Sequence, residues 1–176
     1  RRRMLNSLQA HSKQIGKNFA FLSEHINDLY SCYLDAVHGI MSHPGPQGAL
    51  AAAEKDADTV RVLNYPALFR YCFPETIITI RNPAPHIGDR MANFALTYGF
   101  RPEMELRYQA DCDDVLNDTY KTSRLYALKI NELRKKYADQ LLRGEFRDTD
   151  DLAAVPKGLT ATSFVNGDTM AVVLWN

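Results

Sequence analysis

The sequence predicts an α/β protein: the C-terminal part of a (β/α)8 TIM-type barrel over residues 1–143, then the first strands of an antiparallel β domain over residues 144–176. Three observations predict this fold class. Two short apolar segments without polar alternation, residues 18–23 and 76–80, are typical of strands buried on both faces of a parallel sheet. A long amphipathic helix follows them. The pattern then changes to strands joined by a hairpin turn.

Each element before the second strand is predicted from a local signal. Apolar residues at helical spacing indicate a helix that ends near Gly16. A Pro- and Gly-rich stretch with a charged end is typical of a loop or insertion. The predicted elements, in chain order, are a helix over 4–15, a strand over 18–23, a short helix over 29–37 ended by Gly39, a loop over 40–59 and a helix from Pro66 to just before Pro74.

The segment Thr76–Ile80 is mostly β-branched and gives the clearest strand signal. It is followed by a Pro-rich loop over 82–88 and by a helix over 90–98, which Asp89 can cap and Gly99 closes. Pro102 is expected to open a further helix through Leu106.

The longest predicted helix covers residues 115–143, because apolar residues recur there at spacings of three and four and indicate one continuous buried stripe. Gly144 ends it. Phe146, Leu159–Val165 and Met170–Trp175 then indicate strands, with Asn166–Asp168 as the hairpin turn.

Both sets of strands are small for the folds they indicate. Two or three antiparallel strands with open edges are marginally stable alone, and two parallel strands are a quarter of an eight-stranded barrel. We therefore expect the chain to be part of a longer protein. The alternative is a complete, small α+β domain of 176 residues.

Composition excludes several functional classes. Lys+Arg and Asp+Glu balance at 21 each, so no net field favours nucleic acid or an anionic membrane surface. No apolar run approaches the roughly 20 residues of a membrane span. The three cysteines lie far apart and form no C-x-x-C pair, which indicates neither a disulfide framework nor a zinc site. Dinucleotide, P-loop, serine-hydrolase and zinc-protease motifs are absent, and no cofactor is expected.

Functional groups of parallel α/β sheets and barrels gather at the carboxyl ends of the strands. This rule selects Glu24, His25 and Asp28 after the first predicted strand, and Arg81 and His86 after the second. A carboxylate at the rim of a partly desolvated pocket favours its protonated form and suits proton donation.

Structural alternatives stand beside these interpretations. For Glu24 and Asp28, a functional role and capping of the next helix are favoured equally. For Arg81 an ion pair with Asp89 is slightly favoured, and His86 is expected to be an exposed loop residue.

No metal site is expected. Asp111, Asp113 and Asp114 lack the glycine and ligand spacing of a calcium loop and are better explained as caps of the following helix. His38 and His43 show no metal-ligand spacing. The aromatic residues Tyr65, Phe69, Tyr71 and Phe73 favour a core, with stacking on a sugar ring as the alternative for one of them.

Four stretches of the chain together resemble the C-terminal half of bacterial glycoside-hydrolase-like proteins, including a poorly characterised family with a barrel followed by a β-sandwich. They cover most of the chain outside the predicted loop. The stretches are residues 21–28, residues 68–81, residues 89–99, and residues 141–147 together with 170–176.

The resemblance implies a fragment of a glycosidase with a carbohydrate substrate. It implies that Glu24 is the general acid/base, with His25, Asp28, Arg81 and His86 as supporting or substrate-binding groups. A second carboxylate is expected from an earlier strand outside this chain. The rival interpretation is a non-catalytic carbohydrate-binding or scaffold protein that has the barrel fold.

Overall fold

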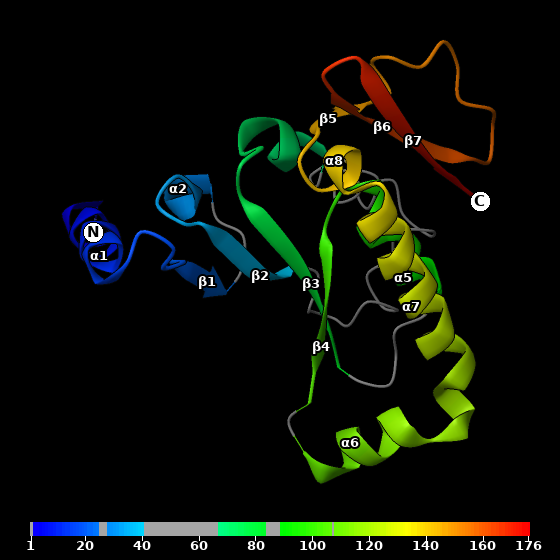
Figure 1. The fold of residues 1–176 in the computed structure, drawn as a ribbon, viewed down its shortest axis with the longest axis horizontal. Helices are drawn as coiled ribbons and strands as arrows, with labels where there is room; N and C mark the ends of the chain where they lie inside the picture. Colours follow the sequence, from blue (N-terminus) through cyan, green and yellow to red (C-terminus); the bar gives the residue numbers. More distant parts are fainter. Residues whose placement is uncertain (1, 25–27, 41–66, 84–88, 107) are drawn as a thin grey trace.

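The computed structural model describes residues 2–24, 28–40, 67–83, 89–106 and 108–176. These residues form a mixed α/β structure with two sheets, one parallel with four strands and one antiparallel with three. The antiparallel sheet and the N-terminal helix lie at opposite ends of the parallel sheet (Figure 1). The α/β class predicted from the sequence is therefore confirmed.

The parallel sheet contains twice the number of strands that the sequence predicted. Its order follows the chain, β1–β2–β3–β4, and every neighbouring pair is parallel. The strands are β1 (Leu22–Glu24), β2 (Ala36–Ile40), β3 (Ile77–Pro83) and β4 (Arg101–Glu105).

One face of this sheet carries the main core. Ile78 and Ile80 of β3 are buried there against Phe69, from a helical segment over residues 67–72, and against Phe94 of α5 (Asp89–Thr97). Side chains alternate along a strand, so Thr79, between the two isoleucines, belongs to the opposite face. The helices thus pack on one face and leave polar side chains on the other.

One predicted helix is a strand in part, and another is a strand throughout. The predicted helix over 29–37 consists of the short α2 (Asp28–Ser31) and the start of β2, because Val37 is β-branched and fully buried between β1 and β3. The helix predicted from Pro102 is β4. Proline has no backbone N–H, and it is tolerated here because β4 is the last strand of the sheet in the described residues.

The predicted long helix is interrupted. Residues 109–141 form α6 (Gln109–Leu116), a 3-10 turn η1 (Asp118–Tyr120), α7 (Lys121–Lys136) and α8 (Ala138–Leu141). Asn117 caps η1 by accepting a hydrogen bond from the Thr119 backbone N–H at 2.9 Å. Tyr137 leaves the helical conformation. The predicted buried stripe is also partly wrong, since Leu133 and Tyr137 are exposed.

The antiparallel sheet confirms the strands predicted near the C-terminus. It contains β5 (Glu145–Asp148), β6 (Thr160–Asn166) and β7 (Thr169–Trp175), in the order β5–β6–β7. The β6–β7 hairpin turns at Gly167, whose φ of 57° suits glycine. The change of sheet type falls at Gly144, where the sequence pattern also changes.

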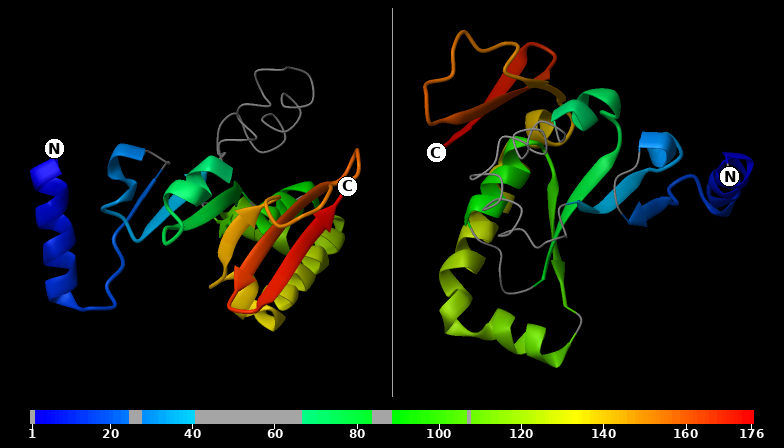
Figure 2. Two further views of the ribbon diagram at one scale, coloured as in Figure 1. Left: turned by 90° about the horizontal axis from the view of Figure 1, so that it is seen from above. Right: turned by 180° about the vertical axis from the view of Figure 1, so that it is seen from behind.

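A second core joins this sheet to the helices. Phe146, Phe164 and Val173 of the sheet pack with Leu96 of α5 and Leu141 of α8, and Figure 2 shows the sheet beside the end of α7 and α8. Gly99, with a φ of 67°, lies close to the Phe164 ring of this sheet. A Cβ added at Gly99 would be 3.0 Å from that ring. The sequence predicted this glycine as the end of α5.

The N-terminal helix α1 (Arg2–Ile15) is attached by polar contacts. Lys13 Nζ lies 2.9 Å from the Asp35 carboxylate, which also accepts a hydrogen bond from the Phe21 backbone N–H. The Lys13 contact, followed by that backbone bond, lowers the pKa of Asp35. The predicted loop over 40–59 lies outside the described residues, except Ile40 at the end of β2.

Candidate functional site

Glu24 is the last residue of β1, in agreement with its predicted place at a strand end. The predicted strand over 18–23 is shorter and displaced, because only Leu22–Glu24 pairs with β2. The register places Glu24 opposite His38 of β2. Neighbouring strands lie about 4.8 Å apart, so the backbones of these two residues are adjacent.

Three polar side chains from the next three strands meet on the face of the sheet opposite the core. We call His38 of β2, Thr79 of β3 and Glu103 of β4 the strand-face cluster. The Thr79 hydroxyl donates a hydrogen bond to Glu103 Oε2 at 2.5 Å. The other carboxylate oxygen, Glu103 Oε1, lies 3.6 Å from His38 Nδ1.

The geometry of this cluster depends on a short side chain at its centre. His38 and Glu103 belong to strands two positions apart, roughly 10 Å between backbones. Their side chains approach each other across β3 because Thr79 lies between them and occupies little space. The long Glu103 side chain can therefore reach back over β3.

The cluster has hydrogen-bonding capacity left over. His38 Nδ1 is buried yet has no hydrogen-bond partner among the described residues, since 3.6 Å to Glu103 is too long. The side chains of His38 and Glu103 nevertheless keep 29% and 34% of their exposure. A group that approaches from the open face can reach part of each side chain, although not His38 Nδ1 itself, and such partial exposure is the arrangement expected of a binding or proton-transfer site rather than of a closed structural network.

A second predicted residue lies beside the same cluster. Arg81, which the sequence placed at the end of a strand, is within β3 and pairs in register with Glu103. Glu24 and Arg81 are thus register neighbours of two members of the cluster. The proposed ion pair of Arg81 with Asp89 stays a prediction.

The other predicted site residues are not brought to the cluster by any described contact. Asp28 is the first residue of α2, as its alternative role in starting a helix predicts. His25 and His86 lie outside the described residues.

Sequence reasoning missed the cluster for two reasons. Glu103 was assigned to a helix opened by Pro102, and His38 was considered only for metal-ligand spacing. Both lie in strands too short or too interrupted for periodicity to show. The available signal was the alternation in Thr-Ile-Ile-Thr-Ile, which puts Thr79 on the face away from its apolar neighbours.

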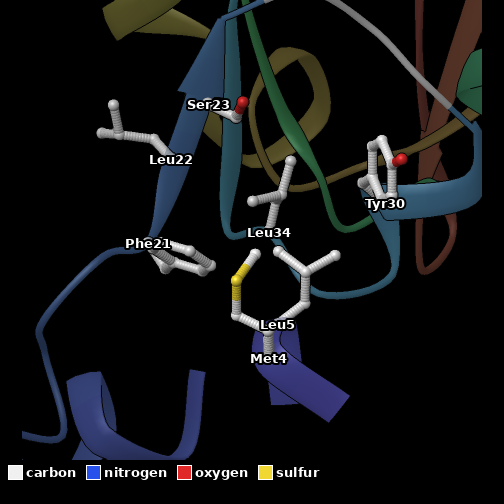
Figure 3. A pocket seen from close by; sticks show the side chains of 7 residues that line it. All are labelled: Met4, Leu5, Phe21, Leu22, Ser23, Tyr30 and Leu34. Atoms are coloured by element: carbon white, nitrogen blue, oxygen red, sulfur yellow. The ribbon is translucent and has the colours of Figure 1, made fainter. Parts of the chain in front are cut away.

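An apolar cavity of about 380 Å³ lies between α1, β1 and α2. Figure 3 shows Met4 and Leu5 of α1 facing Phe21 and Leu34 across it. Leu22 and Ser23 of β1 both line the cavity, whereas His38, Thr79 and Glu103 do not. Its lining carries no charged group. It suits an apolar group and is separate from the strand-face cluster.

Two of the four aromatic residues near the helical segment 67–72 belong to the core that the sequence favoured for them, whereas Tyr71 is 41% exposed. Phe69 belongs to the main core, and Phe73 packs against it. Tyr71 stacks edge-on against Phe146 at 5.5 Å and donates a hydrogen bond to Asp150 at 3.1 Å. Tyr65 lies outside the described residues.

Two negative findings apply to the part of the chain that the structure describes. It contains no group of three or more His, Cys, Asp or Glu side chains placed to hold a metal ion. Asp111, Asp113 and Asp114 lie within α6, so the cap predicted for them is wrong. No helix there is long and apolar enough to cross a membrane.

Comparisons with protein-family models, with curated proteins and with solved structures gave no match to this chain.

Proposed function

We propose that the protein is part of a glycoside hydrolase that uses carboxylate general acid/base catalysis, with Glu24 as the acid/base. The observation that carries the proposal is the position of Glu24. It ends a parallel strand and lies in register beside a half-open polar cluster with a second carboxylate. Glycoside cleavage needs two carboxyl groups that flank one bond, on a surface open to a sugar.

The strand order supports a barrel wall as the scaffold. Four parallel strands follow one another in chain order, β1–β2–β3–β4. A doubly wound sheet reverses its order at a switch point, whereas a (β/α)8 barrel continues in one direction around its axis. In a barrel the helices lie outside, the strands turn their other face inward, and the catalytic groups lie at the carboxyl ends of the strands. The helix-covered Ile78 face and the open Thr79 face match this division.

Arg81 is assigned to substrate binding within this proposal. Its register position beside Glu103 places a guanidinium-bearing residue next to the carboxylate, and five N–H donors suit the hydroxyls of a sugar. His25, Asp28 and His86 stay proposed supporting groups.

The test uses the longer protein that contains this chain. Wild-type protein is screened for hydrolysis of aryl glycosides and of polysaccharides, and then compared with Glu24→Gln. Loss of a general acid should lower kcat/KM by about 10²–10⁴-fold on poor leaving groups while the unfolding midpoint stays unchanged. Glycan binding without turnover in the wild type would instead establish the non-catalytic carbohydrate-binding alternative. Full turnover in Glu24→Gln would remove Glu24 from the mechanism.

A further inference from the structure

We infer that Glu103 is the second catalytic carboxylate and acts as the general base on a water molecule, held in position by Thr79. This inference rests on the proposed function, and it replaces the expectation that the second carboxylate comes from a strand outside this chain.

The two carboxylate oxygens of Glu103 have different contacts and are assigned different roles. Oε2 accepts the Thr79 hydrogen bond, which fixes the carboxylate above β3. Among the described contacts, Oε1 lies near the imidazole of His38, at a distance too long for a hydrogen bond. The Glu103 side chain keeps 34% of its exposure, and we assign the attacking water to Oε1 because Oε2 is the oxygen that accepts the Thr79 hydrogen bond.

Two strand spacings separate the backbone of Glu24 from the strand over which the Glu103 carboxylate lies, and within the proposal we assign Glu103 the part of a base rather than of a direct nucleophile. The Glu103 carboxylate reaches back over β3, and the β1 backbone that carries Glu24 lies two strand spacings away, roughly 10 Å. Inverting glycosidases hold their carboxyl groups about 6.5–9.5 Å apart so that water fits between them and the sugar, and retaining enzymes about 5–5.5 Å apart.

The step balances without any further reactant. The water oxygen bonds to the anomeric carbon, and its proton passes to Glu103 Oε1. The bond between the anomeric carbon and the glycosidic oxygen breaks, and its electron pair stays on that oxygen, which takes the proton of Glu24. Proton exchange with solvent then restores both carboxyl groups. The product has the inverted anomeric configuration.

His38 is assigned a positioning role. It lies between the register position of Glu24 and the Glu103 carboxylate. Its buried Nδ1 lies 3.6 Å from Glu103 Oε1 and limits how far that carboxylate oxygen can move toward β2.

Substrates with different leaving groups distinguish the roles proposed for Glu24 and Glu103. On wild-type protein and variants, kcat/KM is measured with a 2,4-dinitrophenyl glycoside, which leaves without protonation, and with a methyl glycoside, which requires it. Glu24→Gln should lose activity mainly on the methyl glycoside. Glu103→Gln should lose about 10²–10⁴-fold on both substrates. Glu132→Gln, an exposed carboxylate on α7, is the matched control and should behave as wild type.

Thr79 is tested by rescue. Thr79→Val should lower kcat with little change in KM, and Thr79→Ser, which keeps the hydroxyl, should restore kcat to near the wild-type value. A purely steric role for Thr79 would leave the valine variant active, because threonine and valine have nearly the same shape. Circular dichroism and urea unfolding of each variant show whether it is folded.

Several outcomes overturn the inference while the proposed function stands. They are an active wild type in which Glu103→Gln retains full turnover, a Glu103→Gln loss confined to the methyl glycoside, and a product of retained configuration by NMR. A wild type without activity on any glycoside contradicts the proposed function itself.

Discussion

The two sheets of this protein hold their hydroxyl groups in different surroundings, although each also contains a buried ring nitrogen without a hydrogen-bond partner among the described residues, which in the antiparallel sheet is Trp175 Nε1. In the antiparallel sheet, Thr162 is buried and donates a hydrogen bond to the Thr97 carbonyl at 2.6 Å, and the buried Ser163 donates to the Asp148 carbonyl at 3.3 Å. In the parallel sheet, the strand-face cluster leaves His38 Nδ1 without a hydrogen-bond partner among the described residues.

The difference leads to different expectations for the two sheets. A buried hydroxyl with a backbone partner contributes to the fold and has no capacity for a ligand. The strand-face cluster, in which the Thr79 hydroxyl donates to a carboxylate whose side chain keeps 34% of its exposure, contributes less to stability and keeps that capacity. The antiparallel sheet is therefore expected to respond to mutation through stability, and the parallel-sheet face through activity.

The largest expected effect on stability comes from the core that joins the two regions. Phe164 is almost fully buried and contacts Phe146 at a ring distance of 5.4 Å. Phe164→Ala should lower the free energy of unfolding by about 3–5 kcal/mol, because it removes a large buried side chain and leaves a cavity. Urea unfolding measures this, with Phe19→Ala as the matched control at a position 45% exposed. A similar loss in both variants would contradict the assignment of Phe164 to the core.

An intermediate effect tests the comparison of the two sheets directly. Thr162→Val should destabilise the protein by about 1–3 kcal/mol, because it leaves the Thr97 carbonyl without its buried donor. Thr79→Val should cost less than about 1 kcal/mol, because water can still reach the Glu103 carboxylate. Equal losses of unfolding free energy in the two variants would remove the distinction drawn here.

The smallest effect is a pH dependence at the junction of the two regions. Burial, with a further contribution from the charge of Asp150, raises the pKa of Asp148. A raised pKa in the folded state means that stability is greatest below the unfolded pKa and declines as pH rises through the folded pKa. Asp148→Asn should therefore stabilise the protein at neutral pH, by less than about 1 kcal/mol, since water still reaches part of this side chain.

Asp35 serves as a control, because its pH dependence of stability is expected to have the opposite sign. Its lowered pKa contributes stability above the unfolded value, and this is lost as pH falls through the folded pKa. Asp35→Asn should be slightly less stable than wild type at neutral pH and equal to it at the acid end. Thermal unfolding from pH 3 to 8 gives both profiles. Slopes of the same sign for Asp35 and Asp148 would contradict the assigned causes.

Elements with strong local signals were predicted correctly from the sequence. The α5 helix and its terminal Gly99, the β-branched strand β3 and the β6–β7 hairpin all contain capping, branching or turn residues that act within a few positions. Glu24 was also found at a strand end, because the apolar run before it is a local pattern.

The tertiary structure alone decided the rest, and the reason is pairing between distant segments. Ala36–Ile40 and Arg101–Glu105 have weak local preferences for strand, and they become strands because β3 offers hydrogen bonds on both sides. The same pairing brings His38, Thr79 and Glu103 together from three separate segments. By itself the sequence determined the α/β class and the place of Glu24 at the end of a strand; the strand register determined which groups lie beside Glu24.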